Sequence, residues 1–375
     1  MPSRQPKIVA VIGTRPEVIK MAPVINKLKE KDGWKTVVVC TAQHREMLDQ
    51  MLEIFSIAPD VDLNIMTPNQ ALTRSFSRAI EGMGGVLDEL KPDFVLVQGD
   101  TNTVFATALA AFYHRVSVGH VEAGLRTSDP HIPFPEEMNR RLTSVVSTLH
   151  FAPTARAVDN LRAEGIPAEN IFLTGNTVVD ALLWIDRKFS DLYPKIAQEI
   201  LARDHRIVLV TAHRRENFGR RLREICEGLL ELVRLFDDVE IVYPVHLNPA
   251  VRQTVFEVLG GMERIHLIEP LPYHEFVRLM SLSSLILTDS GGIQEEAPSF
   301  GKRVLVLRDE TERPEAVEAG YAVLVGADKM KIVTQASHFL SNNQIGIETG
   351  FNPFGDGKAA ERIVKYLEKF LNGGI

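Results

Sequence analysis

The segment Phe94-Val-Leu-Val-Gln98 is a short apolar run, and Gly99-Asp-Thr-Asn-Thr103 follows it directly. Runs of this length without alternating polar residues are typical of parallel strands buried on both faces. The residues from Thr103 to His114 are mostly apolar and long enough to form a helix. The segment therefore predicts a strand, a polar turn and a crossover helix, which together are the repeating unit of an α/β fold.

The same pattern recurs along the chain, for example at Val208-Leu-Val210 and Val304-Leu-Val-Leu307. Strands are predicted at Lys7–Ile12, Thr36–Thr41, Phe94–Gln98, Ser117–His120, His150–Ala152, Ile171–Thr174, Ile207–Thr211, Glu240–Pro244, Ile265–Ile268, Leu285–Thr288, Val304–Leu307 and Ala322–Val325. Helices are predicted at Leu72–Leu90, Thr103–His114, Pro135–Ser147, Val178–Lys188, Leu222–Phe236, Ile293–Phe300 and Lys358–Asn372. This alternation predicts the α/β class with right-handed crossovers.

The chain has 375 residues, which is enough for two domains of ordinary size. The segment from Lys188 to Asp204 separates a helix from a fresh series of strand–helix units. We therefore expect an N-terminal domain at 1–188, a C-terminal domain at 189–357 and a last helix within 358–375. Two Rossmann-like, doubly wound domains would each present the carboxyl ends of their strands to a ligand between them.

Composition and charge exclude several classes of protein. The chain is 45% hydrophobic and 24% charged, which argues against disorder. Its net charge of −7 and the lack of a basic segment argue against nucleic-acid binding. The longest apolar stretch, Val104–Tyr113, is too short to span a membrane. The N-terminus lacks a signal-peptide pattern, and Cys40 and Cys226 lie in apolar runs typical of buried thiols. We expect a soluble, cytoplasmic protein with a small-molecule partner.

Polar residues concentrate directly after the predicted strands of the first half. The first strand ends in Gly13-Thr-Arg-Pro-Glu17, where Arg15 lies at a helix start that also attracts anions. An ordinary turn with a surface arginine is the alternative. Asp100 follows the third strand, where it could instead cap the next helix. Glu122 lies in an apolar, glycine-containing stretch, where a lone carboxylate is costly to bury unless it is paired or used.

The segment Pro133-Phe-Pro-Glu-Glu-Met-Asn-Arg-Arg141 has a structural and a functional interpretation. The structural one places Glu136–Arg140 and Glu137–Arg141 as two i,i+4 ion pairs on one helix. The structural interpretation explains the Glu137–Arg141 pair well, but it explains the two pairs together less well.

The second half carries two polar motifs after buried strands. His213-Arg-Arg-Glu-Asn217 fits a phosphate pocket, because guanidinium groups bind such oxygens bidentately. A satisfied core histidine is the alternative. In Asp289-Ser-Gly-Gly-Ile-Gln-Glu-Glu296, the two glycines let the backbone approach a diphosphate at a helix start, and Glu296 could reach ribose hydroxyls. The structural alternative is Ser290 as a helix cap followed by an acidic first turn.

Other motifs are absent. No G-x-G-x-x-G, Walker A, H-E-x-x-H, C-x-x-C or G-x-S-x-G pattern occurs, and the D-x-D at Asp60-Val-Asp62 has no partner cluster. We therefore expect neither a cofactor nor a metal.

Eight motifs together resemble the non-hydrolysing UDP-N-acetylglucosamine 2-epimerases of bacteria, in order and spacing over almost the whole chain. They are Gly13-Thr-Arg-Pro-Glu17, Gln43-His-Arg45, Gln98-Gly-Asp100, Gly119-His-Val-Glu-Ala-Gly-Leu-Arg126, Pro135-Glu-Glu-Met-Asn-Arg140, Thr211-Ala-His-Arg-Arg-Glu-Asn217, Asp289-Ser-Gly-Gly-Ile-Gln-Glu-Glu296 and Thr311-Glu-Arg-Pro314. The resemblance implies a GT-B-like fold whose last helix crosses back to the first domain. It also implies a homodimer and the interconversion of UDP-GlcNAc and UDP-ManNAc, which supplies surface polysaccharide synthesis.

The resemblance also implies roles for single residues. UDP-binding positions fall on Arg15, His213, Ser290, Gly291, Gly292, Glu296 and Arg313, with Phe276 against the uracil. Positions near the sugar or in catalysis fall on Lys20, Asp100, Glu122, Glu136 and Arg140. His213 would also help the departing diphosphate. A second, activating UDP-GlcNAc site would involve Gln43, Arg214 and His246, whereas Glu46 and Asn69 depart from its pattern.

Three alternatives stay open at this point. The chain could act on a related UDP-sugar or release the free sugar by hydrolysis. It could be a GT-B glycosyltransferase, or a nucleotide-sugar sensor without turnover. The carboxylates Asp100, Glu122 and Glu136, opposite a phosphate-binding set, count against the sensor.

Overall fold

The computed structural model of the chain describes residues 5–41, 45–65, 70–127, 129–341 and 351–374. It divides into two compact units, residues 1–181 with 354–375 and residues 182–353. The first division falls within helix α7 (Thr177–Lys188), and both divisions come a few residues before the boundaries expected from the sequence. Each unit is described separately below.

Within its described residues, unit 1 is built on a seven-stranded sheet with the order β3-β2-β1-β4-β5-β6-β7, and every printed pairing is parallel. Its strands are β1 (Lys7–Ile12), β2 (Lys35–Cys40), β3 (Val61–Asp62), β4 (Phe94–Gln98), β5 (Ser117–Val121), β6 (Leu149–Ala152) and β7 (Ile171–Leu173). Its helices are α1 (Arg15–Lys29), α2 (Arg45–Ile54), α3 (Leu72–Leu90), α4 (Asn102–Tyr113), α5 (Glu136–Val146), α6 (Ala155–Ala163), the 3-10 turn Ala168–Asn170, the start of α7, and α15 (Ala359–Leu371).

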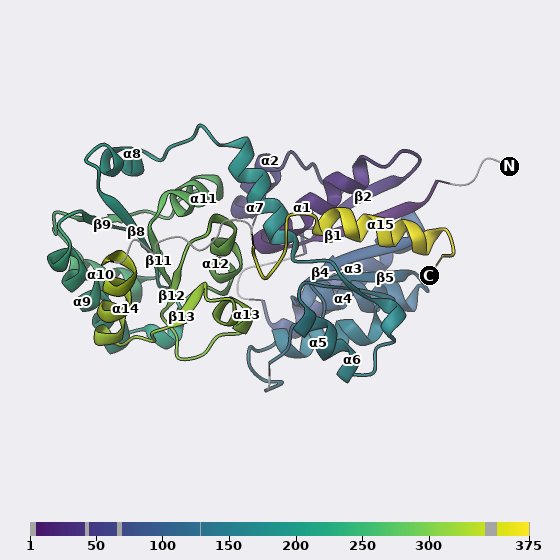
Figure 1. Cartoon of the computed structure of the whole chain (residues 1–375). Helices are drawn as coiled ribbons and strands as arrows, with labels where there is room; N and C mark the ends of the chain where they lie inside the picture. The colour runs from purple at the N-terminus through teal and green to yellow at the C-terminus, as the bar shows by residue number, and fades with distance from the viewer. Residues whose placement is uncertain (1–4, 42–44, 66–69, 128, 342–350, 375) are drawn as a thin grey trace. The chain divides into compact units, whose positions relative to one another are not determined.

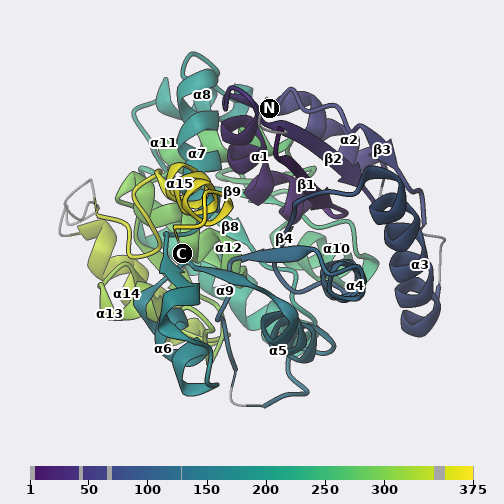
Figure 2. The same cartoon turned by 90° about the vertical axis from the view of Figure 1, so that its right-hand side faces the viewer.

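Helices cover both faces of this sheet. On one face, the side chains of Val9 and Val95 are buried in a cluster with residues of α3 and α4. On the other face, α15 lies beside α1 (Figures 1 and 2), and the ring of Phe370 lies 5.5 Å from that of Phe94. The start of α15 is held by the buried Asp180 of α7, whose carboxylate accepts hydrogen bonds from the backbone N–H groups of Ala359 (3.1 Å) and Ala360 (2.8 Å). The C-terminal helix is thereby part of the core of unit 1.

Unit 2 repeats the same plan with a six-stranded parallel sheet in the order β10-β9-β8-β11-β12-β13, counted over the residues that the structure describes. Its strands are β8 (Arg206–Thr211), β9 (Val239–Pro244), β10 (Ile265–Ile268), β11 (Leu285–Thr288), β12 (Val304–Val306) and β13 (Ala322–Leu324). Its helices are α8 (Lys195–Leu201), α9 (Arg220–Leu235), α10 (Pro249–Leu259), α11 (Tyr273–Leu282), α12 (Gly291–Glu296), α13 (Pro314–Glu318) and α14 (Lys329–Ser341), with 3-10 turns at Arg215–Asn217 and Ala297–Phe300. Residues of α9, α10 and α14 bury the main core cluster against β8, β9 and β11.

The expected fold class, two parallel α/β domains, is confirmed. Each predicted strand is present within one residue at either end, and Cys40 and Cys226 are buried free thiols. The helix predicted at Ile293–Phe300 instead begins at Gly291 and tightens into a 3-10 turn from Ala297, where Pro298 removes a backbone donor. The strand Val61–Asp62 was not predicted, because two residues carry no periodicity.

In each sheet, successive strands are added first toward one edge and then, after a single reversal, toward the other edge. In unit 1 the reversal lies between β1 and β4, and in unit 2 it lies between β8 and β11. At such a point, the helices that follow the two strands leave toward opposite faces and open a crevice at the strands' carboxyl ends. These two edges are therefore where ligand-binding side chains are expected.

Candidate active site

In unit 1, the buried Glu17 joins the turns that follow β1 and β4. Its Oε2 accepts hydrogen bonds from the backbone N–H groups of Gly13 (2.6 Å) and Thr14 (3.0 Å). Its Oε1 accepts from the hydroxyl of Thr101 at 2.7 Å. Burial raises the pKa of Glu17 to about 7, although these three donors act in the opposite direction. Arg15, the first residue of α1, and Asp100, which precedes Thr101, thus lie on turns that share one support.

Asp100 forms an ion pair rather than a helix cap. Its Oδ2 lies 2.5 Å from Nη2 of Arg140 on α5, and Thr101 caps α4 by accepting from the N–H of Val104. The side-chain amide of Asn139 also donates to the carbonyl oxygen of Asp100 at 3.0 Å. The capping alternative for Asp100 is therefore wrong, because its carboxylate is turned toward α5.

Of the two i,i+4 ion pairs predicted on helix α5, the described residues contain Glu137–Arg141 but not Glu136–Arg140. Arg141 donates to the buried Glu137 at 2.7 Å, whereas Arg140 lies near Asp100 and, at 3.3 Å, Glu137. Glu136 is the half-buried first residue of α5, and no ion pair joins it to Arg140 among the described residues. The predicted Glu136–Arg140 pair is wrong, since Arg140 reaches across to the β4 turn instead.

Glu122 lies directly after β5 and is held by three donors from three segments. It forms an ion pair with Lys20 of α1 and accepts hydrogen bonds from the side-chain amides of Gln98 (2.5 Å) and Asn176 (3.0 Å). Its backbone φ is +65°, in the left-handed region that non-glycine residues seldom adopt. A strained backbone held by specific contacts is frequent at functional sites. Lys20, Glu122 and Asn176 thus form one polar cluster at the ligand edge of the sheet.

His120 supports the turn that carries Asp100. Its Nε2 lies 2.7 Å from the carbonyl oxygen of Gly99, to which it donates as the Nε2–H tautomer. Gly99 has φ of +84°, and the side chain of His120 is completely buried. Burial lowers the pKa of His120 to about 3, so the ring is neutral at ordinary pH.

In unit 2, the buried Asp289 connects the turns after β8 and β11. Its Oδ2 accepts hydrogen bonds from the backbone N–H groups of His213 and Arg214, both at 2.9 Å, and from the side-chain amide of Asn217 at 3.0 Å. The ring of His213 stacks on that of His246, with 5.4 Å between centroids and 16° between planes. The structure thus brings His213, a predicted UDP-binding residue, next to Arg214 and His246 of the predicted activating site.

The other predicted UDP-binding residues of unit 2 surround α12. Tyr273 of α11 donates its hydroxyl hydrogen to Glu296 at 2.8 Å, and Phe276 lies one turn further along α11. Arg313 forms an ion pair with the buried Glu295. Ser290 occupies the N-cap position of α12 but makes no side-chain capping hydrogen bond among the described residues, and the first turn carries no acidic residue, so the structural alternative for this motif is wrong. A side chain at Gly291 would approach the Arg313 guanidinium at 3.9 Å. These residues form one cluster within unit 2.

Three residues of the predicted activating site have no described side chain. Gln43 and Asn69 lie outside the described residues. Glu46 belongs to α2, but its side chain is outside what the structure describes.

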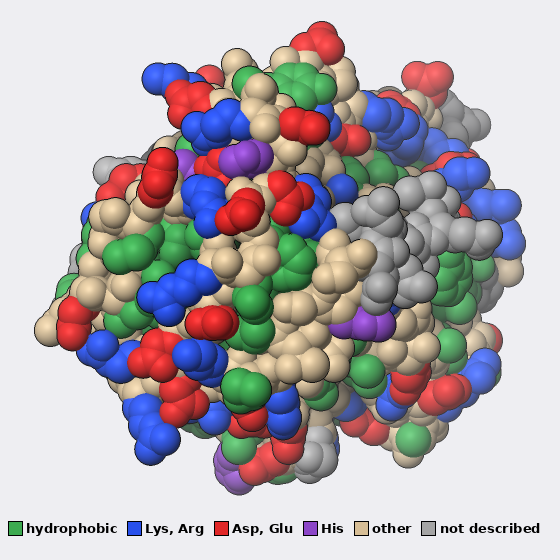
Figure 3. All heavy atoms as spheres, turned by 60° about the vertical axis from the view of Figure 1, so that its left-hand side comes forward, with side chains coloured by type: hydrophobic (Ala, Val, Ile, Leu, Met, Phe, Trp, Pro, Cys, Tyr) green, Lys and Arg blue, Asp and Glu red, His purple; other side chains and the backbone are tan. Residues whose placement is uncertain are grey.

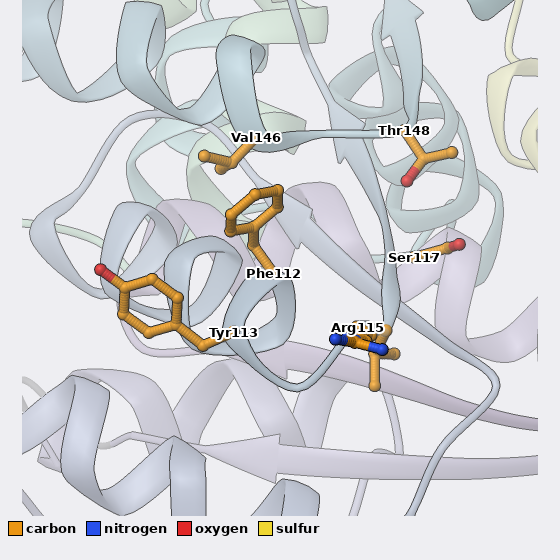
Figure 4. A pocket seen from close by; sticks show the side chains of 7 residues that line it. Phe112, Tyr113, Arg115, Ser117, Val146 and Thr148 are labelled. Atoms are coloured by element: carbon orange, nitrogen blue, oxygen red, sulfur yellow. The ribbon is translucent and has the colours of Figure 1, made fainter.

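A pocket of about 500 Å³ in unit 1 lies away from this site (Figure 4). It is lined by Phe112, Tyr113, Arg115, Val116, Ser117, Val146 and Thr148. Ser117 begins β5, so the pocket lies at the amino end of a strand whose carboxyl end leads to Glu122. It is therefore at the opposite edge of the sheet from the candidate site.

The described part of the chain contains no helix that is long and apolar enough to cross a membrane. Its His, Cys, Asp and Glu side chains form no group of three that could hold a metal ion, again within the described residues. Lys and Arg side chains are interspersed with Asp and Glu on the face drawn in Figure 3.

Comparison with known proteins decides the family. The family model described as UDP-N-acetylglucosamine 2-epimerase matches residues 26–368. The UDP-N-acetylglucosamine 2-epimerase of Escherichia coli K12 is 52% identical over 371 residues, covering 96% of this chain and 98% of that protein. The chain belongs to the UDP-N-acetylglucosamine 2-epimerase family. The resemblance deduced from the eight motifs is confirmed, and so is the assignment of the chain to a family of isomerases.

Solved structures of the family have the same fold. The UDP-GlcNAc 2-epimerase of Neisseria meningitidis, solved with UDP-GlcNAc bound, is 48% identical with a TM-score of 0.87, covering 97% of this chain and all of that one. The Staphylococcus aureus protein MnaA, solved with UDP, is 46% identical with a TM-score of 0.89, covering 99% of this chain and 98% of that one. A GT-B-like α/β architecture is therefore shared across the family.

Three supporting residues of the site were not predicted from sequence. Glu17 ended a quoted motif, but a first-turn carboxylate normally signals only a helix start. Asn176 follows β7, so the rule that polar residues after strands are functional could have identified it. Asp289 precedes the glycines that drew attention, and its position after β11 was the available signal.

Proposed function

We propose that the protein catalyses the reversible epimerisation of UDP-GlcNAc to UDP-ManNAc at C2 of the sugar. UDP would be eliminated to give 2-acetamidoglucal and then added back after a proton has returned to the opposite face. The observation that carries this proposal is the pair of carboxylates, Asp100 and Glu122, which follow the neighbouring strands β4 and β5. Family membership supplies the substrate class.

The leaving group is the first chemical requirement. The hydrogen on C2 is not next to a carbonyl group, so it becomes acidic only as the C1–O bond breaks. Positive groups that neutralise the departing diphosphate therefore lower the barrier. We assign this role to Arg15, at the start of α1, and to His213 and Arg313 in unit 2, together with the backbone at Ser290 to Gly292.

Proton transfer is the second requirement. As positive charge builds at C1, one carboxylate takes the C2 proton, and a second acid returns a proton to the opposite face. Each such step is worth about 10²–10⁴-fold in rate. Asp100, Glu122 and Glu136 are the candidates, and Arg140 and Lys20 hold the first two in place.

The nucleoside would bind in unit 2. Phe276 is assigned to the face of the uracil, and Glu296 to the ribose hydroxyls. The hydrogen bond from Tyr273 fixes Glu296 beside the helix that carries Phe276, which supports placing the base and ribose next to each other.

We also propose a homodimer. Helix α5 exposes an apolar stripe of Met138, Leu142 and Val145, and Phe112 and Tyr113 of α4 are more than half exposed. Exposed apolar patches of this kind mark protein interfaces. The pocket of Figure 4 is part of the same surface, because Phe112 and Tyr113 line it. Gel filtration with light scattering should give twice the chain mass, and Val145→Asp should reduce that mass to one chain.

The proposed role is cytoplasmic supply of UDP-ManNAc for surface polysaccharide synthesis. Incubation of the pure protein with UDP-GlcNAc alone, followed by proton NMR, tests the activity. UDP-ManNAc at equilibrium with the substrate is expected. Free ManNAc would indicate a hydrolysing enzyme. No conversion would reject the epimerase and leave a glycosyltransferase that needs an acceptor or a nucleotide-sugar sensor.

A further inference from the structure

The side chain of Asp289 is completely buried behind His213 at the ligand edge of unit 2. Its Oδ2 is occupied by three donors, which are two backbone N–H groups and the amide of Asn217. Its Oδ1 is buried without a hydrogen-bond partner among the described residues, and Nδ1 of His213 lies 3.4 Å from it. A buried acceptor left without a donor is costly, so this geometry requires an explanation.

We propose that Asp289 is a positioning residue that fixes the tautomer and the charge of His213. A carboxylate oxygen can only accept, so Nδ1 must carry the hydrogen that faces Oδ1. Nε2 is then the ring atom available to a ligand. Since phosphate oxygens also accept, Nε2 can donate to a diphosphate only when the ring is protonated. Asp289 would thus make His213 bind the diphosphate as a cation.

The pKa of His213 is lowered overall from its ordinary value, and Asp289 acts against that lowering. Burial lowers the pKa of His213, and the neighbouring Arg214 and His246 lower it further. Asp289 is the neighbouring group that raises it. Removing its charge therefore leaves only influences that favour the neutral ring.

Asp289→Asn isolates the proposed effect. The amide oxygen of asparagine can replace Oδ2 and keep all three existing hydrogen bonds. Its NH₂ group then faces Nδ1 of His213 as a donor, so Nδ1 must accept and Nε2 carries the hydrogen. The variant thus keeps the local scaffold while reversing the tautomer. Asp309→Asn, which removes one negative charge from an exposed pair with Arg221, is the matched control.

Two measurements test the proposal. Imidazole ¹⁵N NMR of the ligand-free protein should show an Nδ1–H tautomer for neutral His213, and an Nε2–H tautomer with a lower pKa in Asp289→Asn. Titration with UDP at several pH values should show a crossover between the variants. At a pH below the His213 pKa of the wild type but above that of Asp289→Asn, the variant should bind UDP about five- to tenfold more weakly, because a charge-assisted hydrogen bond becomes a neutral one. At high pH it should bind as well as the wild type or better, because only the variant keeps an Nε2–H donor.

A double-mutant comparison shows whether Asp289 acts through His213. In a His213→Ala background, Asp289→Asn should change UDP affinity by less than twofold if the effect passes through the ring. Weaker binding by the same factor at every pH, or an unchanged His213 tautomer, would overturn the proposal. The UDP experiment depends on the proposed function, whereas the NMR experiment on the ligand-free protein does not. Failure of wild-type UDP binding would therefore reject the function and leave the tautomer result to be judged separately.

Discussion

The carboxylate of Asp100 lies 2.5 Å from the guanidinium group of Arg140, although forty residues separate them in sequence. This ion pair connects the turn after β4 with the second turn of α5. Asn139, the residue before Arg140, binds the backbone of Asp100, so the two elements are joined twice. The position of the candidate acid/base group therefore depends on α5 as well as on its own strand.

Replacing Arg140 by methionine removes this ion pair while keeping an unbranched side chain. We expect turnover to fall about 100-fold or more, because a misplaced acid/base group loses most of its contribution. UDP affinity should stay within about threefold of the wild-type value, since Arg140 is not among the residues assigned to UDP. Steady-state kinetics and calorimetric titration measure the two effects. Arg162→Met, at an exposed i,i+3 pair, is the control and should leave both unchanged.

His213→Ala should weaken UDP binding, whereas Glu136→Gln should reduce turnover without weakening UDP binding. The first removes a group assigned to the diphosphate, so UDP binding should weaken by about tenfold or more. The second changes an acid/base candidate, so UDP binding should persist while most turnover is lost, and Asp100→Asn should behave in the same way. Calorimetry and a coupled assay on the three variants separate these outcomes. Equal UDP affinities in the first two variants would reject the assignment of His213.

The fold was predictable because its signals are local. The buried strands of both sheets, such as β4 and β11, are apolar runs that end at polar or glycine residues, and this pattern needs no knowledge of tertiary structure. Short peripheral elements such as β3 lack such a pattern, so their form depends on packing.

The site was predictable in part. Asp100, Glu122 and His213 were singled out because each follows a strand, and their proposed roles came from the family resemblance. The ion-pair partners of these residues were not predicted, because the choice of partner depends on distances in the folded chain that the sequence does not contain. Arg140 was placed with Glu136 by helical spacing, whereas the folded chain brings Asp100 closer. Glu17 and Asp289 were overlooked because a buried carboxylate resembles a helix cap until its hydrogen-bond donors are counted.

His120 makes the stability of the protein sensitive to acid. Its folded pKa of about 3 lies below its ordinary value of 6.5, so its contribution to stability is complete above pH 6.5 and is lost as the pH falls toward 3. The free energy of unfolding should fall by at most about 1.4 kcal/mol per pH unit from this group. Glu17 acts in the opposite sense, because its raised pKa makes its contribution greatest at low pH and smaller as the pH rises toward 7.

Comparison of the wild type with His120→Gln isolates the histidine. The variant should be less stable at pH 7.5, because the hydrogen bond to Gly99 is weakened, but it should lose less stability between pH 6.5 and pH 4.5. Urea unfolding at each pH gives the slopes. Parallel stability curves for the two proteins would contradict a neutral, buried His120.

Activation by UDP-GlcNAc should be weakened or altered. The family resemblance implies an amide at position 46 and an arginine at position 69, where this chain has Glu46 and Asn69. Both changes disfavour a second diphosphate-bearing ligand. Rates from UDP-ManNAc should therefore rise little when trace UDP-GlcNAc is added, and Glu46→Gln with Asn69→Arg should increase the response. Strong activation of the unmodified protein would show that the two departures are harmless.

The central claim is that the hydrogen at C2 leaves and is replaced from solvent. The purified protein, without any added cofactor, is incubated with UDP-GlcNAc in D₂O, and C2 of each nucleotide sugar is followed by NMR. We predict deuterium at C2 of the UDP-ManNAc formed, and later at C2 of the UDP-GlcNAc formed by the back reaction. UDP-ManNAc that keeps the original hydrogen at C2 would contradict the account.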